Sequence, residues 1–317
     1  MNLPTRPSLE AFSEPAADGY LIGGFTWRHL RTHRKRTVVI INAATSVRCR
    51  HYSRFADYLF ANDIDVITYD YRGIGESRSG SLRGFNASWS DWGALDFEAM
   101  LQRAQREFPG QPIDVVGHSF GGCAAGLAAS GGVIRRIVTV GAQYAYWRDY
   151  QASTRWRMLA KWHVIMPLVT GLCGYFPGKR LGWLEDTPAG VVRDWSTPTP
   201  RYETRPSGRA LDELPFSRVR AQLLAISITD DPFATVAAIE RLLSYFDHSE
   251  RTHLRIAPED IGEKQVGHFA FFRSEYQHRL WPVALAWLQN GQLTADTLGI
   301  SSNLRFNTPP RSRTQGR

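Results

Sequence analysis

Short apolar runs rich in β-branched residues recur along this chain and alternate with stretches of helical spacing. The runs cover residues 37–42, 64–70, 113–117, 134–141 and 221–228, and residues 252–256 can form a sixth strand. A continuous apolar run of this length indicates a strand that is buried on both faces. Strands that alternate with helices predict an α/β fold with a mostly parallel central sheet and helices on both of its faces. Ligand sites in such sheets lie at the carboxyl ends of the strands.

The alternation stops after the fourth run and resumes at the fifth. Residues 144–205 contain no strand run, and they hold five of the ten tryptophans. Because this interruption starts at the carboxyl end of a strand, we expect a helical cap that covers the site. The predicted organisation is a core of residues 1–143 and 206–290, a cap of residues 144–205, and a polar, flexible tail of residues 291–317.

The composition narrows the class of protein. A chain of 317 residues with 43% hydrophobic and 21% charged residues has the balance of a globular protein with one large domain. It has no run of eighteen apolar residues, and its N-terminus lacks the apolar stretch of a signal peptide. We therefore expect a cytoplasmic protein without a transmembrane segment. Three cysteines are too few and too scattered for a disulfide framework or a zinc site.

The net charge of +8 owes much to two basic segments, residues 28–36 and residues 305–317. A basic cluster can attract nucleic acid or anionic lipid. No nucleic-acid-binding motif accompanies these residues, so we interpret them as solvated surface and expect no nucleic-acid partner.

Residues 117–122 read Gly-His-Ser-Phe-Gly-Gly and contain the pattern Gly-x-Ser-x-Gly. An apolar run precedes the pattern and small residues follow it, which is the strand–turn–helix context of a nucleophilic serine. Side chains two positions before or after Ser119 would collide with neighbouring elements on so sharp a turn, hence the glycines. The N–H of Phe120 is then placed to bind an oxyanion. The alternatives are a phosphate-binding loop or a plain turn, but no Gly-Lys-Ser/Thr or Gly-x-Gly-x-x-Gly pattern follows.

A serine hydroxyl needs a base, and the base needs an orienting carboxylate. After such a serine turn, the acid comes next in the chain and the histidine last. His268 lies in a glycine-introduced turn between the last buried run and the last helix, and we expect it to be the base. Asp231 follows the fifth run on a turn set by Pro232 and is the expected acid. Asp230 is the second choice, and whichever aspartate is not used would cap a helix.

The second oxyanion donor is expected in the loop after the strand that ends at Asn42. Small residues there permit close approach of the backbone, and we predict the Ala44 N–H, with Ala43 as the next candidate. The alternative is a simple turn. Residues 70–77, Asp-Tyr-Arg-Gly-Ile-Gly-Glu-Ser, are interpreted as structural, because an aspartate–arginine pair and two glycines can fix a loop beside the site.

Together, these motifs and the later Asp-Asp-Pro-Phe and Gly-His resemble the α/β-hydrolase superfamily over about residues 18–288. The closer likeness is to predicted bacterial hydrolases near the monoglyceride-lipase, lysophospholipase and serine-aminopeptidase group. The resemblance implies an α/β-hydrolase fold, with Ser119 as nucleophile, His268 as base and Asp231 as acid. It also implies oxyanion donors at Phe120 and Ala44, and a cap that shapes an acyl pocket.

One departure from the family concerns the oxyanion loop. Many members have His-Gly before the first oxyanion donor, whereas this chain has Asn42-Ala43.

We therefore expect a serine hydrolase that acts on an acyl ester through an acyl-enzyme, with no metal and no organic cofactor. The partner would be a small acyl substrate. The aromatic-rich cap favours an apolar substrate; the alternative is that the aromatic rings only fill the core of the cap. An aminopeptidase would need an acidic group for the substrate amine, for which Glu185 and Asp186 are candidates. An acyltransferase or a non-catalytic binding protein on the same fold would also be compatible with these motifs.

Overall fold

The computed structural model describes residues 8–30, 36–208, 210 and 213–304. Most of the two basic segments, residues 31–35 and 305–317, lies outside this part of the chain. The described strands of the main sheet follow the order β1-β2-β4-β3-β5-β6-β9-β10-β11. Their bounds are Ser8–Pro15 for β1, Leu21–Arg28 for β2, Val38–Asn42 for β3, Asp65–Tyr69 for β4, Ile113–His118 for β5, Ile134–Val140 for β6, Gln222–Ile228 for β9, Glu250–Ile256 for β10 and Ile300–Asn303 for β11.

The centre of the sheet is parallel, as the uninterrupted apolar runs predict. Strands β4, β3, β5, β6, β9 and β10 pair in parallel, while β1, β2 and β11 add antiparallel edges. Every residue of β3, β4 and β5 is buried, because helices cover both faces. The fold-class prediction is therefore confirmed.

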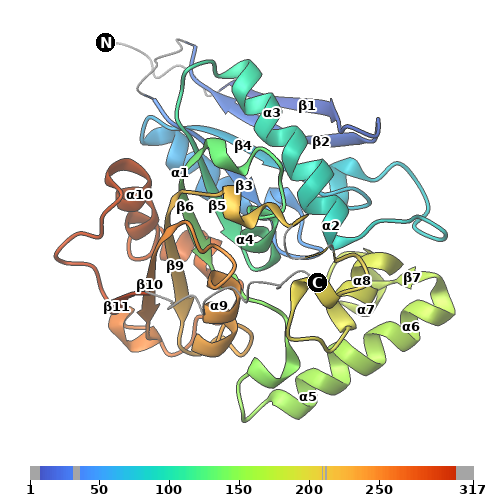
Figure 1. The fold of residues 1–317 in the computed structure, drawn as a ribbon. Helices are drawn as coiled ribbons and strands as arrows, with labels where there is room; N and C mark the ends of the chain where they lie inside the picture. The colour runs from blue at the N-terminus through green and yellow to red at the C-terminus, as the bar shows by residue number, and fades with distance from the viewer. Residues whose placement is uncertain (1–7, 31–35, 209, 211–212, 305–317) are drawn as a thin grey trace, which may run out of the picture.

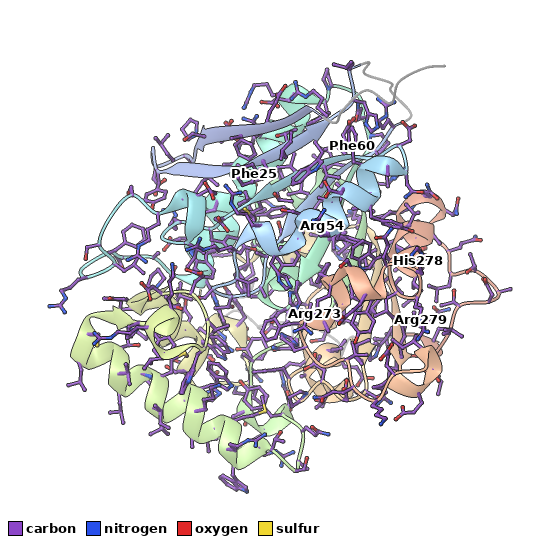
Figure 2. All side chains as sticks on the ribbon, turned by 180° about the vertical axis from the view of Figure 1, so that it is seen from behind. Phe25, Arg54, Phe60, Arg273, His278 and Arg279 are labelled. Atoms are coloured by element: carbon purple, nitrogen blue, oxygen red, sulfur yellow. The ribbon has the colours of Figure 1, made fainter. Side chains whose placement is uncertain are left out.

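Two helix layers enclose this sheet. Helices α1 (Ser53–Ala61) and α10 (Trp281–Asn290) lie side by side on one face, where the rings of Phe55 and Trp281 are 5.3 Å apart. Helix α3 (Glu98–Glu107) crosses the opposite face, which is nearer the viewer in Figure 1. Figure 2 shows the molecule from the other side, where α1 with Arg54 faces the viewer. Helices α4 (Phe120–Ala124) and α9 (Val236–Leu243) follow β5 and β9.

The segment between β6 and β9 forms a separate helical layer. Its elements are α5 (Arg155–Leu159), a π-helical segment (Ala160–Ile165), α6 (Met166–Cys173), α7 (Gly178–Leu181), α8 (Ala189–Ser196) and the two-residue strands β7 (Tyr175–Phe176) and β8 (Thr187–Pro188). In Figure 1 these yellow-green elements gather at one end of the molecule. This layer leaves the core directly after β6, so it begins at the carboxyl end of a central strand.

Three features differ from the sequence expectations. The polar N-terminal residues 8–15 form β1, whose backbone pairs with β2 although its side chains give little apolar signal. Part of the tail expected from residue 291 forms β11, which pairs with β10 through backbone groups and keeps its side chains exposed. The helical spacing of residues 272–288 predicts one closing helix, but α10 begins only at Trp281. Pro282 favours the first turn of a helix, and 3-10 turns occupy Ala270–Phe272 and Ser274–Tyr276.

No helix in the described part of the chain is long and apolar enough to span a lipid bilayer.

Candidate active site

Ser119 stands on a strained turn between β5 and α4. Its φ of 52° and ψ of −119° are unusual for a residue with a side chain. A Cβ at Gly117 would lie 2.6 Å from the Gly122 nitrogen, and one at Gly121 would lie 2.2 Å from the Asn42 carbonyl oxygen. Both glycines are therefore required by close packing, as the motif predicts. Ser119 is 8% exposed, and its hydroxyl has no hydrogen-bond partner among the described residues.

His268 and Asp231 form a tight pair beside this turn. Nδ1 of His268 lies 2.6 Å from Oδ2 of Asp231. The other oxygen, Oδ1, accepts the N–H groups of Phe233 at 2.9 Å and Ala234 at 3.2 Å. These backbone donors fix the carboxylate, so that its free oxygen faces the imidazole. The pair therefore places the histidine proton on Nδ1 and leaves Nε2 as the acceptor.

Asp230, the second candidate acid, binds the backbone of the loop that carries His268. Its carboxylate accepts the N–H groups of Val266 at 2.9 Å and Gly267 at 2.8 Å. It therefore holds the loop that carries His268 and does not contact the imidazole. It is not the helix cap we expected from sequence: Thr235 caps α9 instead, by accepting the Ala238 N–H at 3.3 Å.

A cavity of about 210 Å³ opens between the core and the helical layer. Ser119 and His268 line it together with aromatic residues from both parts of the chain. The indoles of Trp162 and Trp195 stack at 4.7 Å, and Trp89 stacks on Phe120 at 5.0 Å. Some tryptophans of residues 144–205 thus line the cavity, although Trp156 is 70% exposed.

Comparison with known proteins agrees with this fold. The sequence model described as "Serine aminopeptidase, S33" matches residues 32–173, somewhat less than half of the chain. An esterase of Pyrococcus furiosus superposes with a TM-score of 0.56 at 14% identity, over 89% of this chain and 92% of the other. A puromycin-hydrolyzing peptidase of Mycobacterium tuberculosis has a TM-score of 0.57 at 14% identity, over 95% of this chain but 42% of the other. A cold-adapted esterase from an Arctic intertidal metagenomic library has a TM-score of 0.52 at 13% identity, over 93% of this chain and all of the other.

The chain has the α/β-hydrolase fold, and residues 32–173 match the serine aminopeptidase family model. None of the curated proteins matches the chain. The identities are low, so the structural likeness defines the fold of this chain, while its chemistry must be argued from its own residues.

His118 also stabilises the site, although it was not among the predicted site residues. His118 precedes Ser119 and is fully buried. Its Nδ1 lies 2.8 Å from the Tyr52 hydroxyl, and its Nε2 lies 2.9 Å from the carbonyl oxygen of His268. Burial, followed by the charge of His268, lowers the pKa of His118 well below its usual value. His118 is therefore neutral, so Nε2 donates to His268 and Nδ1 accepts from Tyr52. Its place inside the serine motif was the available signal.

The loop after β3 carries Ala44, the predicted second oxyanion donor. The Ala44 N–H donates to the Tyr52 hydroxyl at 2.9 Å, so its only proton is already engaged. Thr45 also lines the cavity, and neither its N–H nor its hydroxyl has a partner in the described structure. Phe120 is the first residue of α4, so its N–H has no acceptor within the helix. Phe120 and Thr45 therefore each line the cavity and carry a backbone N–H that has no hydrogen-bond partner in the described part of the chain.

Asp70 joins the segment that follows β3 to the segment that follows β4. Its two carboxylate oxygens accept the N–H groups of Cys49 at 2.6 Å and Glu76 at 2.8 Å. Burial raises the pKa of Asp70, and these two N–H donors oppose the rise. The expected Asp70–Arg72 pair is not formed, because Arg72 binds Asp96 at 2.7 Å and reaches out to the N-terminal hairpin. The 70–77 segment is nevertheless structural, as expected.

No group of three or more His, Cys, Asp or Glu side chains within the described ranges is arranged to ligate a metal ion.

Proposed function

We propose that this α/β-hydrolase cleaves an acyl ester through a covalent acyl-enzyme on Ser119. His268 accepts the proton of the Ser119 hydroxyl as its oxygen attacks the carbonyl carbon. Asp231 holds the imidazole in the required tautomer and stabilises its protonated form. His268 then donates that proton to the leaving alcohol. In the second half of the cycle, His268 takes a proton from water, which attacks the acyl-enzyme. The bond from the acyl carbon to the Ser119 oxygen then breaks, His268 returns the proton to that oxygen, and the acid is released.

The tetrahedral oxyanion would be bound by the N–H of Phe120 and by Thr45. We infer Thr45 in place of Ala44, since the Ala44 N–H is engaged by Tyr52. A threonine at this position offers two donors, its N–H and its hydroxyl. Donors that are already in place when charge develops on the carbonyl oxygen lower the barrier without reorganisation.

One observation carries this proposal: a serine on a strained turn and a histidine oriented by a buried aspartate open onto the same cavity. Asp231 is 3% exposed, so its hydrogen bond to His268 is shielded from water.

An aminopeptidase is less well supported. Such an enzyme needs a carboxylate for the positive charge of its substrate's amino group, yet neither Glu185 nor Asp186 lines the cavity. Glu185 forms an ion pair with Arg48 at 2.9 Å, and Asp186 forms one with Arg78 at 2.9 Å. Both pairs tie the cap to the core. An acyltransferase would share the acyl-enzyme and differ only in the acceptor.

Covalent labelling with a fluorophosphonate probe tests the proposal, together with release of nitrophenol from 4-nitrophenyl esters. Ser119→Ala should abolish both signals, and Ser301→Ala, an exposed serine on β11, should change neither. Retained labelling in Ser119→Ala would show that another residue is the nucleophile. A wild-type protein that neither reacts with the probe nor turns over any ester would favour a binding function on this fold.

A further inference from the structure

The wall of the active-site cavity contains a buried arginine without an acidic partner. Arg205 lines the cavity and is 4% exposed. Its guanidinium donates to the Tyr144 hydroxyl at 2.9 Å, to the Ala145 carbonyl oxygen at 3.1 Å and to the Asp194 carbonyl oxygen. Its faces lie over the rings of Trp89 and Tyr144, at 5.0 and 4.4 Å. All of these partners in the described structure are neutral groups.

Asp194, whose backbone carbonyl oxygen accepts from Arg205, forms no ion pair with it through its carboxylate. The carboxylate of Asp194 is taken by the N–H groups of Trp89 at 2.9 Å and Ser207 at 3.1 Å, and by the Ser207 hydroxyl. Burial raises the pKa of Asp194, and the charge of Arg205 is only a minor influence in the opposite direction. Arg205 therefore remains a buried cation that lacks a direct counter-ion.

The donor count of Arg205 points to an anionic ligand. A guanidinium carries five N–H groups, and the three hydrogen bonds above use one on Nε and one on each terminal nitrogen. One N–H on each terminal nitrogen is left, which matches the two oxygens of a carboxylate. Burial of a cation is costly unless an opposite charge meets it, so a carboxylate in the cavity would gain free energy there.

A second cation lines the same cavity from the cap. The Lys161 ammonium lies 4.4 Å from the ring of Trp162 and 4.2 Å from that of Trp183. Burial lowers the pKa of Lys161. Among the described residues that line the cavity, no aspartate or glutamate is present. The cavity is therefore aromatic and positively charged.

We propose that the substrate ester carries a free carboxylate, which Arg205 binds and Lys161 attracts. This inference rests on the proposed esterase function. It names the substrate class as esters whose acyl or alcohol part ends in an acid, with an apolar chain or ring against the tryptophans.

Paired substrates test the inference. On the acyl side, 4-nitrophenyl monoesters of dicarboxylic acids from adipate to sebacate are compared with the same esters capped as methyl esters. On the alcohol side, 4-carboxyphenyl butyrate is compared with its methyl-capped form. We expect kcat/KM for the acid of at least one pair to exceed that of its neutral match by about ten-fold or more.

Variants assign the preference to the two cations. Arg205→Gln should reduce the acid-to-neutral ratio by about ten-fold or more, and Arg205→Lys should reduce it less. Lys161→Gln should reduce it by a smaller factor and provides the test should the Arg205 variants not fold. Arg54→Gln changes an exposed arginine on α1 (Figure 2) that does not line the cavity, and it should leave the ratio unchanged.

Failure of this inference differs from failure of the proposed function. If wild type turns over neutral esters through Ser119 at rates equal to or above those of the acid esters, the carboxylate site is wrong and the esterase stands. The carboxylate site is likewise wrong if the acid preference survives intact in Arg205→Gln and in Lys161→Gln. If no ester is cleaved and Ser119 is not labelled, the esterase proposal itself fails.

Discussion

Replacing Asp231 by asparagine tests how the triad is oriented. An asparagine has one oxygen and one NH2 group where aspartate has two equivalent oxygens. The N–H groups of Phe233 and Ala234 both point at the position of Oδ1. The amide oxygen must therefore occupy that position, which turns the NH2 group toward Nδ1 of His268. His268 then accepts at Nδ1 and carries its proton on Nε2, so it can no longer take the proton of Ser119.

The size of the effect follows from the same contacts. The opposite amide orientation would set NH2 against two backbone donors and lose two hydrogen bonds of about 1–1.5 kcal/mol each or more. A penalty of about 3 kcal/mol leaves roughly one molecule in a hundred with the competent tautomer. We therefore expect kcat to fall by between about 10² and 10⁴, the upper value being that of the equivalent change in serine-protease triads. Thermal unfolding should shift little, since the amide keeps the backbone contacts.

Asp230→Asn is the matched control. An amide at this position retains one of the two N–H contacts to Val266 and Gly267 and loses the other. We expect a stability loss of about 1–3 kcal/mol and a fall in kcat of less than about ten-fold. Steady-state hydrolysis of a 4-nitrophenyl ester and urea unfolding measure both. A fall in kcat larger for Asp230→Asn than for Asp231→Asn would refute the assignment of the acid.

Three further outcomes follow from the contacts of single residues. Gly121→Ala should destabilise the protein by about 1–3 kcal/mol in urea unfolding and lower kcat, because its Cβ would lie 2.2 Å from the Asn42 carbonyl oxygen; wild-type behaviour would contradict the packing argument. Thr45→Val should lower kcat by about 10²-fold with KM little changed, whereas an unchanged kcat would remove the hydroxyl from the oxyanion hole. His253 is buried against the Ser227 hydroxyl, and burial lowers its pKa to about 4. Between pH 7 and pH 5 this histidine takes up a proton in the unfolded chain, where its pKa is about 6.5, but not in the folded one. The free energy of unfolding of the wild type should therefore fall by about 2 kcal/mol more over this pH range than that of His253→Asn. Equal losses would show that this histidine is not responsible.

Much of the fold could be predicted from the apolar runs. Each run of 37–42, 64–70 and 113–117 forms a parallel strand of the buried centre, because a segment dominated by apolar side chains must be covered on both faces. The edge strands β1 and β11 could not be predicted in the same way. Their pairing depends on backbone groups that every sequence has, and their side chains carry no alternating pattern.

The candidate site was predictable where chemistry restricts residue type. The glycines at 117 and 121 are needed beside Ser119 because any Cβ would overlap backbone atoms, and that requirement is visible as a motif. The sequence order of serine, aspartate and histidine likewise follows from the order of the strands. Which of two adjacent aspartates meets the histidine was an inference from sequence, and the hydrogen bonds distinguish them.

By itself, the sequence determined the alternation of buried strands and helices, the sharp serine turn and the order of the three candidate catalytic residues, because each depends on residue type at short range. Only the tertiary structure shows which backbone donors of the loop after β3 are already engaged. The Ala44 N–H donates to the Tyr52 hydroxyl, which in turn contacts His118, and loop composition alone could not reveal these contacts. The charge of the cavity was also a tertiary property. Nothing in the sequence distinguishes Arg205 and Lys161 from the other basic residues of the chain. Folding buries Arg205 and places both cations on the wall of the cavity that Ser119 lines, where the described lining contains no acid.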